Sequence, residues 1–159
     1  MGESEFQRPS ANPAGGLALA FVGLLGFYSP WGPYAIGYGA SGSGWQSYEA
    51  LYANDKFSLG PLLTLILSSC VIALGMYVAK NQWQGKPSNR QTIAVLAMII
   101  GVLLFTTGYS TNRALDELLS ENGFEFNQGY GLWLSNVVSV AVILSGPVIL
   151  KNPNLTDGI

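Results

Sequence analysis

The longest uncharged stretch of the chain runs from Phe57 to Ala79, and Lys56 and Lys80 stand directly outside it. A helix of these 23 residues would be about 34 Å long, which is enough to cross a hydrocarbon core of about 30 Å. A soluble core helix of this length would show a polar stripe at a 3.6-residue period, but the polar side chains here are uncharged and mostly small. We therefore predict a transmembrane helix.

Three other apolar segments extend this prediction to the whole chain. The predicted spans are residues 14–31, 57–79, 92–110 and 130–150. Charged residues make up 10% of the 159 residues, against about 25% in a typical soluble domain. The fold class that we expect is all-α integral membrane: an antiparallel four-helix transmembrane bundle over residues 16–150, with short tails at 1–15 and 151–159.

The first span has an alternative reading. The apolar run Gly16–Ser29 is short, and with Arg8 before it resembles a cleaved signal peptide. However, no A-x-A cleavage pattern follows the run, and Pro30, Trp31 and Tyr34 are typical of an aromatic interface belt. We expect a retained helix, with cleavage as the alternative.

The distribution of cations predicts the orientation. The tails and the middle loop hold five cations (Arg8, Lys80, Lys86, Arg90 and Lys151), whereas the two long loops hold Lys56 and Arg113. By the positive-inside rule, a multi-pass protein with this pattern has both termini in the cytoplasm. The long loops are then extracytoplasmic.

The two long loops are predicted to form a small aromatic cap. Residues 37–44 read as a flexible Gly/Ser turn, Trp45–Ala53 as one or two helical turns, and 124–126 as a short strand. Asn112–Asn122 has leucines on one face and acids on the other, which predicts an amphipathic extension of the third span. Gly123 is placed to end this helix.

Aromatic residues of this cap are the predicted interaction surface, because such rings commonly anchor protein interfaces, although they also anchor helices at the bilayer surface. The candidate interface residues are Trp31, Tyr34, Trp45, Tyr48, Phe124, Phe126, Tyr130 and Trp133.

Polar and small residues inside the spans are the candidates for helix–helix seams. The polar candidates are Ser69, Thr106, Ser135, Asn136 and Ser139. Asn136 would bond a neighbouring helix, for example at Thr106 or Thr107, or else line a polar pocket. Small residues also recur four apart, as in Gly16/Ala20, Ser69/Ala73, Ala97/Gly101, Ser135/Ser139 and Ala141/Ser145. Such pairs let helices approach closely within the chain, or between copies of it.

Several kinds of chemistry lack the residues that they need. The chain has no histidine and one cysteine, so we expect no zinc or haem site of the common kind, no cofactor and no nucleophilic triad. A net charge of −2 argues against a nucleic-acid partner. The spans contain no ionisable Asp, Glu, Lys or Arg of the kind that marks proton-coupled transport.

An acidic site is the remaining route to catalysis. Asp116, Glu117 and Glu121 lie at helical spacing, and with Glu49 they could build an outward metal site. A solvated helix face explains the same pattern, and we prefer that interpretation. The chain is therefore predicted not to be an enzyme.

Three short motifs carry a resemblance. They are Ser29-Pro30-Trp31, the loop Ser43-Gly44-Trp45-Gln46 followed by Ala50-Leu51, and Gly129–Leu134 at the start of the last span. Together they resemble a broad class of small, mostly uncharacterised prokaryotic four-span membrane proteins. The resemblance implies a four-helix bundle with an aromatic outer cap. The topology is also similar to that of claudin-like tetraspan proteins, but their G-L-W-C-C loop is not matched, because neither long loop contains a cysteine.

The function expected from these patterns is non-catalytic. We predict an accessory or structural subunit that packs against membrane lipid and against another integral membrane protein or a second copy of itself, through the aromatic loops and the small-residue seams. The alternative is a small transporter or channel for an uncharged or lipid-like substrate.

Overall fold

A computed structural model describes residues 13–37, 40–54, 56, 60–84, 86 and 88–151 of the chain. Four helices in this part are long and apolar enough to cross a membrane, which confirms the predicted helical membrane fold in its coarse form. The elements are α1 (Ala14–Tyr28), η1 (Ser29–Trp31), β1 (Pro33–Gly37), β2 (Ala40–Ser43), α2 (Gly44–Ala53), α3 (Gly60–Trp83), α4 (Arg90–Glu121), β3 (Asn127–Gln128) and α5 (Tyr130–Lys151).

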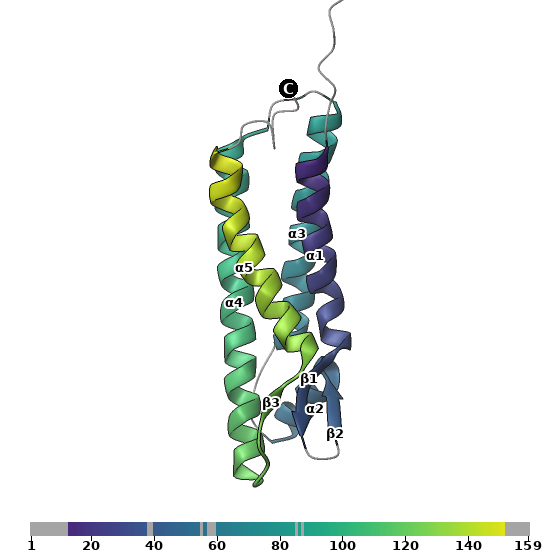
Figure 1. Cartoon of the computed structure of the whole chain (residues 1–159), viewed down its shortest axis with the longest axis vertical. Helices are drawn as coiled ribbons and strands as arrows, with labels where there is room; N and C mark the ends of the chain where they lie inside the picture. The colour runs from purple at the N-terminus through teal and green to yellow at the C-terminus, as the bar shows by residue number, and fades with distance from the viewer. Residues whose placement is uncertain are drawn as a thin grey trace, which may run out of the picture.

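The long helices lie side by side, and the short elements gather at one end of them (Figure 1). We call this the sheet end, because it carries β1, β2, β3 and α2. At the opposite end α1 begins and α5 finishes, near the last turn of α3 (Figure 1). We call this the lysine end, after Lys80 in the last turn of α3 and Lys151 in the last turn of α5.

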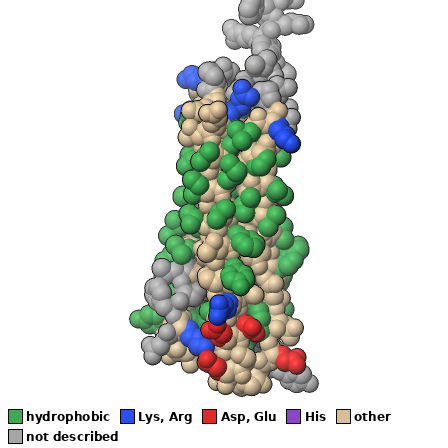
Figure 2. Space-filling view, turned by 90° about the vertical axis from the view of Figure 1, so that its left-hand side faces the viewer, with side chains coloured by type: hydrophobic (Ala, Val, Ile, Leu, Met, Phe, Trp, Pro, Cys, Tyr) green, Lys and Arg blue, Asp and Glu red, His purple; other side chains and the backbone are tan. Residues whose placement is uncertain are grey.

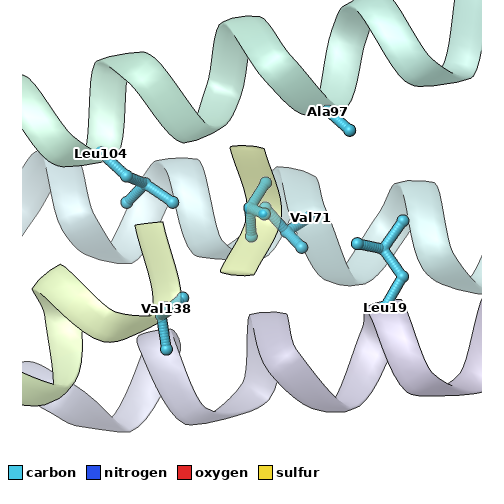
Figure 3. Close-up of a cluster of buried hydrophobic side chains, with 6 residues drawn as sticks. Leu19, Val71, Ala97, Leu104 and Val138 are labelled. Carbon is cyan, nitrogen blue, oxygen red and sulfur yellow. The ribbon is translucent and has the colours of Figure 1, made fainter. Parts of the chain in front are cut away.

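The centre of the bundle is filled by aliphatic side chains from all four long helices. This central core consists of the buried residues Leu19, Val71, Ala97, Leu104, Val138 and Val142 (Figure 3). In a bilayer, apolar burial between helices gives little hydrophobic gain, so close packing must hold such a cluster together.

Glycines bring α1 and α3 into backbone contact. A Cβ atom on Gly16 would overlap the backbone of Gly75 and Ala79, and one on Gly75 would overlap Gly16 and Ala20. Further along α1, Gly23 contacts Ile72 and Gly26 contacts Ser68. The residue numbers of the contacts on α3 therefore fall as those on α1 rise. Of the predicted small pairs, Gly16/Ala20 lies on this seam, and its partner is Gly75/Ala79.

A second seam joins α4 to α5. Gly101 faces Ile143 and the carbonyl of Ser139, and Gly108 faces the side-chain oxygen of Asn136. The small residues Ala97 and Gly101 are both buried here. The helices therefore associate chiefly as two pairs, α1 with α3 and α4 with α5.

The sheet end is a folded region of its own. The strand order is β2-β1-β3, and both pairings are antiparallel, with Ile36 opposite Ser41 on one side and Asn127 on the other. Next in the chain, α2 begins with a capping box: the Ser43 hydroxyl accepts from the Gln46 N–H, and the Gln46 side chain accepts from the Ser43 N–H.

The structure differs from two loop predictions. Part of the predicted flexible turn, Ala40–Ser43, is strand β2, because it pairs with β1. The predicted strand at 124–126 is wrong, since the pairing begins at Asn127. Phe126 is partly buried against the core of the sheet end while Phe124 and Glu125 are exposed, so the apolar alternation reflects side-chain packing without strand pairing.

The predicted end of α4 is confirmed. The helix runs to Glu121, and Gly123 follows with φ of 76°. The N–H of Gly123 donates to Ser120 O and that of Phe124 donates to Leu119 O, which is the Schellman arrangement. Glycine adopts this left-handed conformation without a Cβ penalty.

Candidate functional site

Aromatic rings form a continuous surface where α1 meets α2. The rings of Trp31 and Trp45 pack edge to face with centroids 5.9 Å apart, and Phe27 and Tyr28 lie 5.7 Å and 6.2 Å from Trp31. Trp31 and Tyr28 remain 53% and 61% exposed. We call these four residues the aromatic surface. The 3-10 turn η1 and the capping box of α2 fix the backbone on either side of it.

Other predicted interface residues stay separate from the aromatic surface in the ring contacts of the described chain. Tyr48 is half-buried and stacks on Tyr52 at 6.4 Å. Phe124, Tyr130 and Trp133 are 51%, 64% and 58% exposed, whereas Phe126 packs against the buried core. Phe124 and Phe126 are in the loop before β3, and Tyr130 and Trp133 are in the first turn of α5.

Tyr34 is a correction to the predicted interface, because its side chain is only 1% exposed. It packs in a core at the sheet end with Leu51, Leu115, Leu118 and Leu132, which come from α2, α4 and α5. Strand β1 is sandwiched between β2 and β3 and turns this ring inward. Tyr34 is therefore a structural residue that joins the sheet to three helices.

Burial also changes the chemistry of Tyr34. It raises the pKa of the phenol, and the hydroxyls of Ser29 and Thr64 oppose this only in part. The Tyr34 hydroxyl makes no hydrogen bond of good geometry with the described residues, and the same holds for the buried hydroxyls of Ser68 and Ser135. Ser68 lies against Gly26, so α1, α3 and α5 enclose several hydroxyls near the sheet end.

The predicted seam residues divide into two groups. Ser135 and Ser139 are buried, and Asn136 is partly buried with its side-chain oxygen against Gly108 of α4. Thr106 is exposed and donates to Val102 O of its own helix, so it does not lie on a seam within the chain. Ser69 is partly buried and donates to Leu65 O. One residue earlier, Ser68 is the serine fully buried at the seam.

Two of the acids at the sheet end are paired with cations. Glu121 contacts Lys56 at 2.7 Å, and Glu117 contacts Arg113 at 3.0 Å. No group of three His, Cys, Asp or Glu side chains in the described chain is placed to hold a metal ion. The acids are thus part of a charged surface, which Figure 2 shows as red side chains beside two blue ones at this end.

Two apolar cavities open at the lysine end. One, of about 200 Å³, lies between α1 and α5 and is lined by aliphatic side chains and by four small residues, Gly15, Ala18, Ala141 and Ser145. The other, of about 700 Å³, lies along α1 and α3 between Leu17, Met76, Lys80 and Trp83. Neither cavity is predicted by the sequence, although the small residues Ala141 and Ser145 were a signal for the first.

Phe27 and Tyr28 were also missed, because they sit within an apolar run where exposure cannot be read. Their positions could have indicated the contact, because they precede Trp31 by about one helical turn and their rings pack against its ring. In comparisons with known proteins, no protein-family model, no curated protein and no solved structure matches the chain.

Proposed function

We propose that the chain is an antiparallel four-span membrane protein with its sheet end outside the cytoplasm. The reversed order of contacts between α1 and α3 supports the antiparallel arrangement. The charge distribution supports the orientation: in the described chain, Lys80, Lys86, Arg90 and Lys151 belong to the lysine end, while all acids belong to the sheet end (Figure 2). The packing of α1 on α3 supports a retained first span.

Its proposed role is that of a non-catalytic subunit that binds another integral membrane protein. The observation that carries this proposal is the aromatic surface, where Trp31 stays half exposed although its ring packs against those of Phe27 and Trp45. Rings held in this way lose little conformational freedom when a partner covers them, and Trp and Tyr are the most frequent interface anchors.

The test is purification of the tagged full chain from its native membrane in mild detergent, followed by mass spectrometry. We expect a stoichiometric membrane protein to co-purify. Trp31→Ala should reduce its recovery at least ten-fold, because loss of a buried aromatic anchor typically costs about 2 kcal/mol or more.

Trp83→Ala is the matched control, since it removes a more exposed tryptophan, 77% exposed, from the opposite end. The partner should be recovered in full from this variant. A homogeneous preparation without any stoichiometric protein would rule out the subunit role, and equal losses in both variants would rule out the aromatic surface as the binding site.

A transporter of uncharged polar solutes is the second candidate. It is favoured by the buried hydroxyls of Tyr34, Ser68 and Ser135, which make no hydrogen bond of good geometry with the described residues and are available to a polar solute within the bundle. Uptake by liposomes that contain only this chain would support transport. Ser68→Ala together with Ser135→Ala should then lower the uptake, and no uptake above empty liposomes would exclude it.

A further inference from the structure

The groove between α1 and α3 at the lysine end combines an apolar floor with a cationic mouth. Its lower part is lined by Leu17, Ala73 and Met76, and its mouth by Lys80, Trp83 and Gln84. The volume of about 700 Å³ is within the range of small-ligand sites. The glycine seam explains the shape: Gly16 and Ala79 bring the backbones together, and the larger Leu17, Met76 and Trp83 stand beside them.

The dimensions of the groove match one leaflet of a bilayer. Ala73 and Gln84 are 11 residues apart on α3, or about 16 Å along the helix. A hydrocarbon core of about 30 Å has leaflets of about 15 Å. The apolar lining thus begins near mid-membrane, and Trp83, about 15 Å further along α3, lies at headgroup level. The backbone of Lys80 is about 10 Å from Ala73, and its long side chain extends the ammonium group toward the same level.

Charge at this end favours an anion. Lys80 is exposed, and the acidic side chains of the described chain lie at the opposite end of the bundle, in α2, in the last turns of α4 and in the loop that follows α4 (Glu49, Asp116, Glu117, Glu121 and Glu125). Lys86 and Lys151 are exposed at the same end and add to the positive potential. By contrast, the cations Lys56 and Arg113 at the sheet end are neutralised by Glu121 and Glu117.

We propose that this groove binds an anionic phospholipid, with an acyl chain along Leu17, Ala73 and Met76 and the phosphate beside Lys80. The ammonium group of Lys80 pairs with the phosphate, and the indole N–H of Trp83 and the amide of Gln84 are further donors at the mouth. The site lies at the other end of the bundle from the aromatic surface, so it is independent of partner binding. The lipid proposal depends only on the proposed position of the four helices in the membrane.

The experiment measures lipid binding to the purified full chain by native mass spectrometry, with phosphatidylglycerol and phosphatidylcholine as probes. The wild type should retain phosphatidylglycerol in preference to phosphatidylcholine. Lys80→Gln should lower that preference about five-fold, because a lysine near an anionic lipid contributes about that factor. Lys151→Gln, at the same end but outside the groove lining, is the matched control and should keep most of the preference.

The apolar part has its own test. Ala73→Trp fills the groove while leaving Lys80 in place, and it should also abolish retention of phosphatidylglycerol. Equal binding of the two lipids, equal losses in Lys80→Gln and Lys151→Gln, or full retention in Ala73→Trp would each overturn the proposal. Trp31→Ala should leave lipid binding unchanged, so a failure of this site and a failure of the proposed subunit role give different results.

A photo-crosslinking residue placed at position 73 identifies the occupant in the native membrane. A product with the mass of one anionic phospholipid supports the proposal. A product with the chain's own residues 1–12, with a second copy or with another protein would instead assign the groove to that occupant and overturn it.

Discussion

The two ends of the bundle solve the same packing problem in different ways. At the sheet end, the ring of Tyr34 fills the space between α2, α4 and α5. At the lysine end the buried side chains are smaller aliphatic ones, Val78, Ile93, Ala94 and Ile149, together with the amide of Gln82. There α1 and α3 touch through Gly16 and Gly75, and cavities remain beside them. Loops that fold over helix ends can close a bundle, whereas glycine contacts close only the seam on which they lie.

This difference also separates the kinds of ligand suited to each end. The sheet end offers rigid rings whose neighbours are fixed by packing, which suits a protein partner. The lysine end offers apolar grooves beside lysines that form no ion pair with another described residue, which suits a lipid. Substitutions that fill, empty or charge either end would therefore test whether the contrast is real.

Tyr34→Ala should have the largest effect on stability. It empties a site at which the side chain is 1% exposed, and removal of a buried aromatic ring typically costs about 3–5 kcal/mol. Thermal unfolding in mild detergent, followed by circular dichroism, measures the change. Tyr52→Ala is the control, because Tyr52 is 65% exposed, and a similar loss of stability in both variants would contradict a core role for Tyr34.

Gly75→Val should have the second largest effect on stability. Its methyl groups would overlap the backbone of Gly16 and Ala20, and overpacking of this kind costs about 1–3 kcal/mol. The midpoint of thermal unfolding should fall accordingly. Ala73→Val, on the exposed side of the same helix, controls for β-branching in α3 and should be nearly neutral. An unchanged midpoint for Gly75→Val would mean that the seam is not tightly packed.

Ala141→Leu should act in the opposite direction. Ala141 lines the cavity of about 200 Å³ between α1 and α5, and cavity filling commonly stabilises a protein by about 0.5–2 kcal/mol. We expect a higher unfolding midpoint. Leu144→Val, at a 59% exposed position of α5, should leave it unchanged. A loss of stability in Ala141→Leu would show that this cavity is already filled.

The smallest effect depends on pH. Because burial raises the pKa of Tyr34, the folded state holds the phenolic proton more tightly than the unfolded state does. This contribution to stability is complete below about pH 10 and is lost as the pH rises through the folded-state pKa. Tyr34→Phe should be nearly neutral at pH 7, since the hydroxyl makes no hydrogen bond of good geometry with the described residues.

Unfolding midpoints of wild type and Tyr34→Phe, measured from pH 7 to pH 11, check this expectation. The wild type should lose more stability than the variant above pH 10. Parallel curves would mean that the raised pKa of Tyr34 does not contribute to alkaline unfolding.

The sequence predicts where the long helices lie, but not which face of each helix is buried. The apolar run between Lys56 and Lys80 defines a span because a bilayer excludes charge, and Gly123 marks a helix end because of its backbone freedom. The inward face of a membrane helix carries no comparable signal, since lipid and core are both apolar. Ser68 is buried and Ser69 is not, a rotation of about 100° that the prediction missed.

Loop residues were harder still to assign. Tyr34 and Trp31 belong to one aromatic loop sequence, yet the first is buried and the second exposed. Their difference comes from pairing between residues far apart in the chain, such as Ala35 with Gln128, and from the leucines of α2 and α4 that surround Tyr34. Contacts at such sequence separation leave no local pattern to read.

The length of α4 has one more consequence. Its 32 residues make a rod of about 48 Å, while a hydrocarbon core is about 30 Å thick. The surplus of about 18 Å lies beyond the apolar layer and ends at Glu121. In a bilayer, a helix end of this length would hold a large soluble domain away from the membrane surface beside it. A molecule that binds Trp31 would then approach within the membrane plane or extend a narrow segment past the end of α4.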